Sequence, residues 1–244
     1  MKIEKYKYLG NGKYKIFIDS CDYVFYEDVI LKYNILAKND VSKVELEKYL
    51  SFNKRYDAYY KALSYINIKL RTKSEIISYL KKNSFSDSDI DYAISLLNDN
   101  NYLDEEVYAR AFISDCINLK NVGPIKIKND LIRLGVNNDV IDRELLFFND
   151  EKQNDKVCKF IEKSIRNNKS KSSYVLKNKI KASLINLGYD VSRIDSFLSE
   201  YDFDDRDIYN KQYEIIKNKL SKKYDGKELE LKIKEQLYRK GFRI

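Results

Sequence analysis

The sequence contains no histidine, only seven glycines and one proline among its 244 residues. Without histidine, the chain has no imidazole general base, no Ser-His-Asp or Cys-His catalytic group and no imidazole metal ligand. No stretch has the glycine spacing of a phosphate-binding loop or of a dinucleotide-binding turn. These absences exclude the commonest catalytic arrangements, and we expect no enzyme activity, no catalytic residues, no cofactor and no bound metal.

The three cysteines lie far apart in the sequence and form no Cys-x-x-Cys pair. Their odd number and their spacing argue against a zinc site or a disulfide framework, and favour buried thiols in a reducing compartment. No apolar run approaches the ~18 residues that a membrane span requires, and the N-terminus alternates charges where a signal peptide would be apolar. We therefore expect a cytoplasmic monomer that does not associate with membranes.

The chain is basic, with 46 lysines and arginines against 38 acidic residues and a net charge of +8. Hydrophobic residues make up 43% of it, which is enough for a core, so extensive disorder is not expected. At about 150 residues per domain, the length predicts one elongated domain or two small ones.

Residues 1–52 have the pattern of a small β-rich subdomain with short helices. Tyr14, Ile16 and Ile18 alternate with polar residues, as in a half-buried strand. Residues 2–9 and 23–26 are the expected partner strands, and Gly10-Asn11-Gly12 is typical of a tight turn.

Two helices are expected after these strands. Ile30, Tyr33 and Ala37 have helical spacing, and Ser42 with Glu45 forms a capping box for the second helix. The polar stretch at residues 51–56 is predicted to be a linker to the rest of the chain.

From residue 57 onward one pattern recurs four times: an isoleucine, a leucine four residues later, and glycine or serine four residues after that. The sets are Ile76, Leu80 and Ser84; Ile127, Leu131 and Gly135; Ile180, Leu184 and Gly188; and Ile233, Leu237 and Gly241. Residues one helical turn apart lie on the same face, and glycine readily adopts the left-handed conformation that ends a helix. The pattern predicts four equivalent core helices with similar C-caps, the serine cap being the weaker or different one.

An apolar helix is predicted before each of these core helices, and an amphipathic helix after the first three. We call the resulting units repeat 1 (57–103), repeat 2 (104–148), repeat 3 (149–202) and the partial repeat 4 (203–244). A three-helix unit is too small to bury its apolar faces alone, so the units are expected to stack. We predict a mainly α fold of tandem three-helix repeats forming an elongated curved rod, preceded by a small β-meander with helices.

Lysines flank the recurring isoleucine in repeats 2 to 4, roughly 80–120° around the helix from it. With further basic residues nearby, the candidate partner- or DNA-binding set is Lys126, Lys128, Arg133, Arg166, Lys177, Lys179, Lys181, Lys232 and Lys234. Duplication of a solvated helix face explains the recurrence without binding. A row of cations that binds a polyanion or an acidic groove explains it equally well.

The repeat region resembles the RecX family, the bacterial modulators of the RecA recombinase. Two stretches carry the resemblance: Ala62-Leu63 through Arg71-Thr72-Lys73-Ser74-Glu75 to Leu80, and Tyr102-Leu103-Asp104-Glu105-Glu106 with Ala109-Arg110, Lys120, Gly123-Pro124, Ile127, Leu131 and Gly135. The resemblance implies a binding regulator that lies in the groove of the RecA–single-stranded DNA filament and inhibits RecA, with effects on recombination, DNA repair and the SOS response. It implies the RecA filament as partner, with single-stranded or double-stranded DNA as further candidates.

Two other functions remain open at this point. A stand-alone DNA-binding helical regulator would use the likeness of three-helix units to helix-turn-helix domains. A helical-repeat scaffold would bind some other acidic protein and neither DNA nor RecA.

Overall fold

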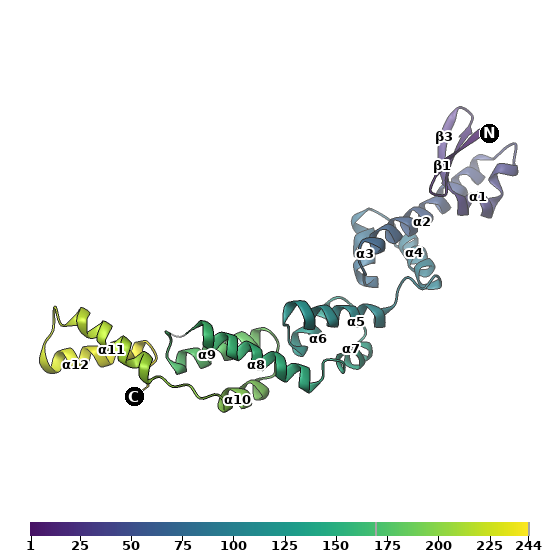
Figure 1. Cartoon of the computed structure of the whole chain (residues 1–244). Helices are drawn as coiled ribbons and strands as arrows, with labels where there is room; N and C mark the ends of the chain where they lie inside the picture. The colour runs from purple at the N-terminus through teal and green to yellow at the C-terminus, as the bar shows by residue number, and fades with distance from the viewer. Residues whose placement is uncertain (169, 244) are drawn as a thin grey trace. The chain divides into compact units, whose positions relative to one another are not determined.

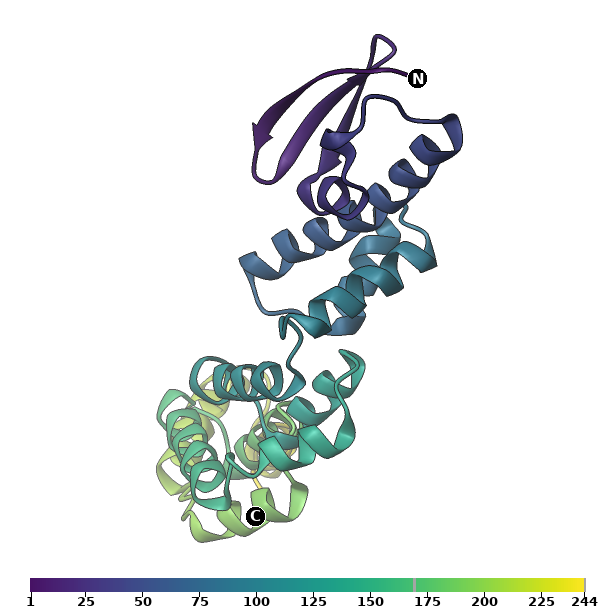
Figure 2. The ribbon, with the colours of Figure 1, turned by 90° about the vertical axis from the view of Figure 1, so that its right-hand side faces the viewer.

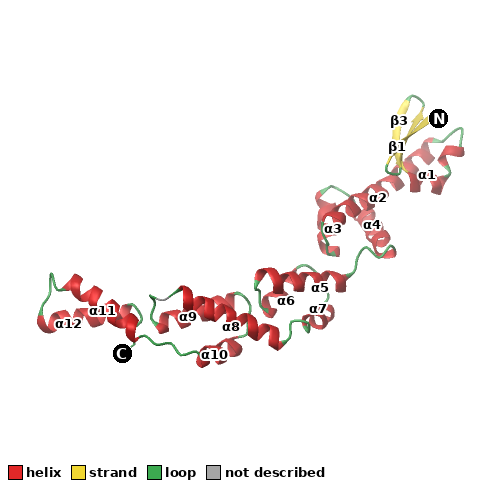
Figure 3. Cartoon of the chain, viewed as in Figure 1, coloured by secondary structure: helices red, strands yellow, loops and turns green. Residues whose placement is uncertain are grey.

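The computed structural model describes residues 1–168 and 170–243, which fold as two compact units. The first unit contains residues 1–108 and 134–136, and the second contains residues 109–133 and those from 137 onward. Within the described residues, three strands lie near the N-terminus and helices follow them (Figure 3). The predicted fold class, mainly α with three-helix repeats and an N-terminal β-meander, is confirmed.

The first unit begins with an antiparallel sheet in the order β1 (Ile3–Gly10), β2 (Lys13–Ile18) and β3 (Cys21–Tyr26) (Figures 1 and 2). Ile16 and Ile18 of β2 are buried, as the alternating pattern predicts. They pack in one cluster with residues of α1 (Glu27–Tyr33) and α2 (Lys43–Ile68). The predicted helix through Ala37 is wrong, because Asn34 adopts a left-handed conformation and only a short 3-10 helix (Ile35–Ala37) follows.

Helix α2 joins the sheet to the first repeat without a break. The predicted linker at residues 51–56 is therefore wrong, since this stretch lies inside α2. Its polar residues have structural contacts: Asn53 accepts a 2.9 Å hydrogen bond from the Tyr26 N–H and donates a 3.0 Å bond to the Val24 carbonyl. The side chain of Phe52 is buried, so the helix packs on the sheet through these residues.

The second half of α2 belongs to the first repeat. Ala58 and Ala62 are fully buried beside α3 (Lys73–Lys82) and α4 (Asp87–Asp99). Alanine at these positions lets α4 approach α2 closely, because its side chain adds little bulk. The capping boxes Ser42–Glu45 and Thr72–Glu75 start α2 and α3.

The remaining helices follow one another in the order that the predicted repeats require. They are α5 (Glu105–Asp115), continued by a short π-helix (Cys116–Lys120), α6 (Pro124–Arg133), α7 (Asn138–Leu145), α8 (Asp150–Asn167), α9 (Ser173–Asn186), α10 (Val191–Glu200), α11 (Arg206–Leu220) and α12 (Gly226–Arg239). Helices α3, α6, α9 and α12 carry the recurring Ile and Leu, and all eight of these side chains are buried.

Each of these four core helices ends in a left-handed residue. Ser84, Gly135, Gly188 and Gly241 have φ values of 62°, 81°, 87° and 87°. In repeats 1, 3 and 4 the N–H of the next residue then donates back to the recurring leucine carbonyl, for example from Tyr189 to Leu184 over 3.1 Å. Ser84 takes the same conformation as the glycines, so the first cap keeps the geometry despite its Cβ.

Within the second unit, the start of the core helix α6 contacts the end of the next core helix, α9; we call such a contact a helix joint. The Gly123 N–H donates to the Leu187 carbonyl over 2.7 Å, and the Ile125 N–H donates to the Gly188 carbonyl over 3.1 Å. Unpaired N–H groups at the start of α6 thus satisfy unpaired carbonyls at the end of α9. A Cβ at Gly188 would lie 2.5 Å from the Lys126 Cβ, so glycine is required here for close packing as well as for its φ value.

The same joint recurs between α9 and α12. The Ser172 hydroxyl donates to the Lys240 carbonyl over 3.1 Å, and a Cβ at Gly241 would lie 2.4 Å from Val175. In the first unit, Gly135 packs against Ser74 in the corresponding way. The recurring glycine is therefore part of a repeated contact between neighbouring repeats.

The cysteines are only partly as expected. Cys116 is buried and burial raises the pKa of its thiol, whereas Cys21 is exposed and Cys158 is half-buried. The expectation of three buried thiols is wrong for Cys21, which lies at the start of the edge strand β3. No helix in residues 1–168 and 170–243 combines the length and the apolar character of a bilayer span.

Candidate partner-binding surface

Five of the nine predicted contact residues already have partners inside the protein. Lys128 pairs with Asp142 over 2.5 Å and Lys181 with Asp195 over 2.6 Å, in both cases linking a core helix to the third helix of its repeat. Two further pairs lie within single helices, Arg133 with Asp130 and Lys232 with Glu235, and Lys177 lies over the Phe203 ring. Much of the predicted row of cations is therefore neutralised within the fold.

The other four predicted residues are exposed and make no ion pair within residues 1–168 and 170–243. They are Lys126 on α6, Arg166 on α8, Lys179 on α9 and Lys234 on α12. Lys179 donates a 3.2 Å hydrogen bond to the Asn168 side chain. Its ammonium also lowers the pKa of the neighbouring Lys171, first through their side-chain contact and then through charge repulsion. These two lysines thus concentrate positive charge at the end of α8.

A basic pocket adjoins this point, and the sequence reasoning missed it. We call it the α8 pocket; its volume is about 480 Å³. It is lined by Lys120, Asn121, Lys156, Lys159, Phe160, Lys163, Ser164, Asn167, Asn168, Leu187 and Tyr189. This set contains four lysines and no acidic residue, and Asn168 connects it to Lys179.

Helix α8 positions three of these lysines on one face. Lys156, Lys159 and Lys163 follow one another at spacings of three and four residues, so their side chains project in the same direction. Asn149 caps the helix by accepting a hydrogen bond from the Lys152 N–H. The helical spacing of the lysines is visible in the sequence, but nearby acidic residues such as Asp155 and Glu162 make the segment look nearly neutral.

The lysines of the α8 pocket differ in their availability. Lys159 pairs with Asp155 over 2.8 Å, and Lys156 donates a 3.1 Å hydrogen bond to the Asn121 side chain. Lys163 makes no hydrogen bond or ion pair within residues 1–168 and 170–243. Tyr189 is buried at the floor of the pocket, where desolvation raises its pKa to about 12. The floor is therefore uncharged at neutral pH, and the rim is cationic.

Chemically, this arrangement suits the binding of an anion. Lysine ammonium groups act as point charges toward phosphates or carboxylates, and the asparagine amides add hydrogen-bond donors. Described residues hold no group of three or more histidine, cysteine or acidic side chains that could bind a metal ion. The site thus has the character of a binding surface.

Comparison with known proteins finds a match for one three-helix unit and for most of the chain. Residues 104–145, which cover α5 to α7, match the family model described as "RecX, second three-helix domain". The chain is 34% identical to "Regulatory protein RecX" of Lactococcus lactis subsp. cremoris, over 88% of this chain and 83% of the relative. It is 32% identical to the protein of the same name from Bacillus cereus, over 100% of this chain and 93% of the relative.

A solved structure shares the fold. It is titled "Crystal structure of regulatory protein RecX" and superposes with a TM-score of 0.72 at 22% sequence identity. The match covers 82% of this chain and 99% of that one.

Proposed function

This chain belongs to the RecX family, and we propose on that basis that it regulates a RecA recombinase. In this proposal it binds along the groove of the RecA–single-stranded DNA filament and inhibits RecA-dependent activities in recombination and DNA repair. The observation that carries the proposal is the 34% identity to a regulatory protein RecX over 88% of the chain. The chain acts by binding and not by catalysis.

The α8 pocket and the unpaired cations beside it are the proposed contact surface. Lys163 and Lys179 face no acidic partner within the described chain, and Lys126 lies next to Gly188 at the adjoining helix joint. DNA phosphates or acidic RecA side chains would supply the missing countercharge. Lys128 and Lys181 hold third helices in place, so their proposed role in partner binding is indirect.

The test is RecA-dependent ATP hydrolysis on single-stranded DNA, titrated with this protein. One variant carries Lys126→Gln, Lys163→Gln and Lys179→Gln. The matched control carries Lys128→Gln, Lys181→Gln and Lys232→Gln, which removes the same charge from lysines that are already paired. We expect the first variant to require about tenfold more protein for half-inhibition, and the control to require less than about threefold more. Equal inhibition by the two variants would show that Lys126, Lys163 and Lys179 do not contact the RecA filament. Absence of inhibition by the natural chain would contradict the proposed function itself.

A second candidate function is direct binding to DNA without RecA. The absence of acidic residues from the lining of the α8 pocket favours it, because such a surface attracts any phosphate backbone. A pulldown on RecA filaments with a bare-DNA control separates the possibilities. Retention on both would add DNA binding to the function, and retention on neither would favour a scaffold for another acidic protein.

A further inference from the structure

The three-stranded sheet has one buried face and one accessible face. Ile16, Ile18 and Phe25 are buried on the face that packs against α1 and α2 (Figure 2). Because side chains alternate between the two faces along a strand, their neighbours in the sequence lie on the opposite face. We call this opposite face the outer face; its exposed or half-buried residues are Lys5, Lys7, Lys13, Lys15, Phe17, Asp22 and Val24.

The outer face carries positive charge that the protein itself does not neutralise. Four of its residues are lysines, and its one acidic residue, Asp22, pairs with Lys15 over 2.5 Å. Lys5, Lys7 and Lys13 make no ion pair within residues 1–168 and 170–243. Their three positive charges are therefore available to an external anion.

Two of the lysines lie directly opposite each other on neighbouring strands. The register of β1 and β2 pairs Lys7 with Lys15. Like charges at directly opposite positions destabilise a sheet, so this pair reduces the stability of the fold. A surface that serves solubility alone has both signs interspersed. The arrangement of the outer face instead favours a bound anion, which offsets the repulsion between the two ammonium groups.

An aromatic ring lies among these charges. The ammonium groups of Lys5 and Lys15 are 4.7 Å and 6.0 Å from the centroid of the half-buried Phe17 ring. Cations beside an aromatic ring suit a single strand, because its phosphates meet the cations while an unpaired base stacks on the ring. Lys5 is exposed, so it can turn from the ring toward a phosphate and open the ring to a base. In a duplex the bases stack on one another and do not reach such a ring.

The positive surface continues beyond the sheet at the hairpin between β1 and β2. Lys13, whose ammonium lies 4.7 Å from the centroid of the Tyr26 ring, also lines a pocket of about 460 Å³. Asn11 and Lys61 line the same pocket and add further hydrogen-bond donors. The acidic residue of the pocket, Asp57, accepts a 2.8 Å hydrogen bond from the Tyr26 hydroxyl. A strand that crosses the outer face therefore meets a further lysine, on α2, where it leaves the sheet.

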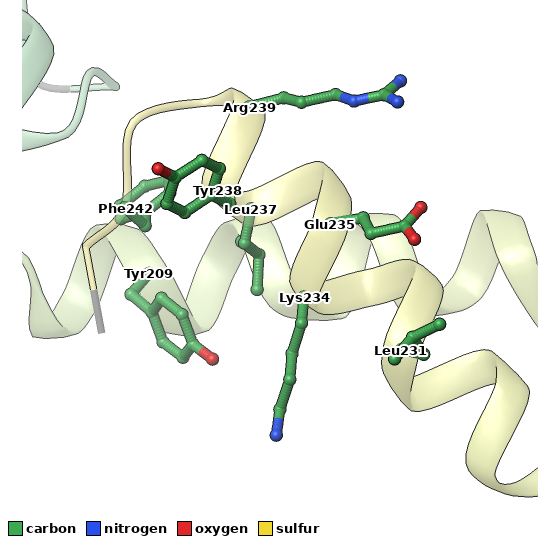
Figure 4. A pocket seen from close by; sticks show the side chains of 8 residues that line it. All are labelled: Tyr209, Leu231, Lys234, Glu235, Leu237, Tyr238, Arg239 and Phe242. Carbon is green, nitrogen blue, oxygen red and sulfur yellow. The ribbon is translucent and has the colours of Figure 1, made fainter.

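Several cations of the core helices, in contrast, lie beside acidic groups. Lys128 and Lys181 pair with aspartates. In a hollow of the fourth repeat, Lys234 and Arg239 line the wall together with Glu235 (Figure 4). Such mixed charge is typical of a solvated helix surface. The outer face carries an excess of one sign, and in this respect it is like the α8 pocket.

We propose that the outer face binds a single-stranded nucleic acid. Lys5, Lys7 and Lys13 contact its phosphates, and one base stacks on Phe17. This site lies in the first unit, whereas the α8 pocket lies in the second. The inference requires neither RecA nor the α8 pocket, so it holds or fails independently of the function proposed above.

A tryptophan at position 17 gives a local readout, because the natural sequence contains none. Phe17→Trp places a single indole on the outer face, and a stacked base quenches its fluorescence. Oligothymidylate or oligouridylate of about 12 nucleotides, which compare DNA with RNA, should quench it saturably by about half in the full chain. A DNA duplex of the same length, or polyglutamate, should quench it less than about one-tenth as strongly. Tyr102→Trp, a matched indole at a 45% exposed position of the same unit outside the outer face, should not be quenched.

The charges are tested by the fluorescence anisotropy of a labelled oligothymidylate. The full chain used here also carries Lys126→Gln, Lys163→Gln and Lys179→Gln, so that the contact surface proposed above does not contribute. In this background, Lys5→Gln with Lys7→Gln should weaken binding about tenfold and make the slope of log affinity against log salt less steep by about 1.4. Lys54→Gln with Lys82→Gln removes the same charge from exposed lysines of α2 and α3, and should change the affinity less than about twofold.

Lys7→Glu separates binding from folding. It places an opposite charge across from Lys15, so the melting temperature should stay the same or rise while the affinity falls more than about tenfold. An unchanged affinity after Lys5→Gln with Lys7→Gln, equal quenching of the two tryptophans, or equal quenching by duplex and single strand would overturn the proposal. Quenching by polyglutamate but by no oligonucleotide would also overturn it, by assigning the outer face to an acidic protein.

Discussion

Single residues at the helix joints have two separate requirements, conformation and space. Gly188 has a φ of 87°, and a Cβ on it would lie 2.5 Å from the Lys126 backbone nitrogen. Gly226 has a φ of 50°, and a Cβ on it would have no neighbouring atom within 4 Å. The two glycines therefore separate the cost of the left-handed conformation from the cost of a steric clash.

We predict that Gly188→Ala destabilises the second unit by more than about 2 kcal/mol, and that Gly226→Ala costs about 1 kcal/mol. Both variants force alanine into a positive φ, but only the first also brings a Cβ to 2.5 Å from Lys126. Urea unfolding followed by circular dichroism measures the difference. Equal loss of stability in the two variants would show that the joint has room for a side chain.

A second residue-scale prediction concerns Glu45 of the first capping box. Its carboxylate accepts hydrogen bonds from the Ser42 N–H and from Lys38, each 2.9 Å long, and these contacts lower its pKa to about 2. Because the folded state has the lower pKa, the ionised group stabilises the fold above the ordinary value of 4.5, and this contribution is lost as the pH falls toward 2.

Glu45→Gln should therefore lower the melting temperature at pH 7 and have progressively less effect between about pH 4.5 and 2. Melting curves of the two proteins across this range test it. A difference that stays constant down to pH 2 would mean that the charge of Glu45 makes no contribution.

At this scale, the sequence predicts what local rules determine. The recurring glycines and the capping box follow from helix geometry within a few residues, and both predictions agree with the structure. The close approach of Gly123 to Gly188 joins residues from different repeats, and no local spacing reveals such a contact.

Among the elements, α2 shows where a polar stretch misleads. The polarity of residues 51–56 suggests a linker, yet Phe52 and Tyr56 lie one turn apart and pack together with a ring separation of 5.6 Å. Asn53 is polar because it bonds to two backbone groups of the sheet, from Val24 and Tyr26. A polar residue in a helix can thus hydrogen-bond to the free backbone groups of an edge strand. The sequence alone does not reveal this role, because it depends on how the helix packs against the sheet.

We predict that Ser51→Pro costs about 3 kcal/mol, since proline in a helix interior removes a hydrogen bond and clashes with the preceding turn. Ser51→Ala is the matched control and should have little effect, because Ser51 is exposed. Thermal unfolding of both variants gives the comparison. Tolerance of proline would support the linker that the polarity of this stretch suggests.

The paired lysines are a second lesson at this scale. Lys128 and Lys181 lie fourteen residues before their aspartates, a spacing that depends on the turn between two helices. From the sequence alone, these lysines cannot be distinguished from Lys126 and Lys179, which make no ion pair within the described chain. The sequence predicts that the core helices carry many lysines. It does not predict which of these lysines form ion pairs within the protein and which remain available to a partner.

For the whole molecule, the net charge of +8 has a measurable consequence. If the α8 pocket binds phosphates, affinity for single-stranded DNA or for the filament should fall as salt rises, because bound phosphates release counterions. We predict that Lys156→Gln with Lys163→Gln makes the slope of log affinity against log salt less steep by about 1.4, or about 0.7 for each lost phosphate contact. Fluorescence titrations on labelled oligonucleotides at several salt concentrations measure it, and an unchanged slope would place the phosphates elsewhere.

The helix joints also bear on how the chain is made. The N–H groups of Gly123, directly before α6, and of Ile125, in its first turn, donate to the carbonyls of Leu187 and Gly188. These carbonyls leave the ribosome only after most of repeat 3 has been synthesised. In a nascent chain that ends before these residues, the N–H groups at the start of α6 therefore lack these hydrogen-bond acceptors. Repeat 2 should gain its full protection from proteases only when the following repeat has emerged, so that maturation proceeds in the direction of translation with a delay of one repeat.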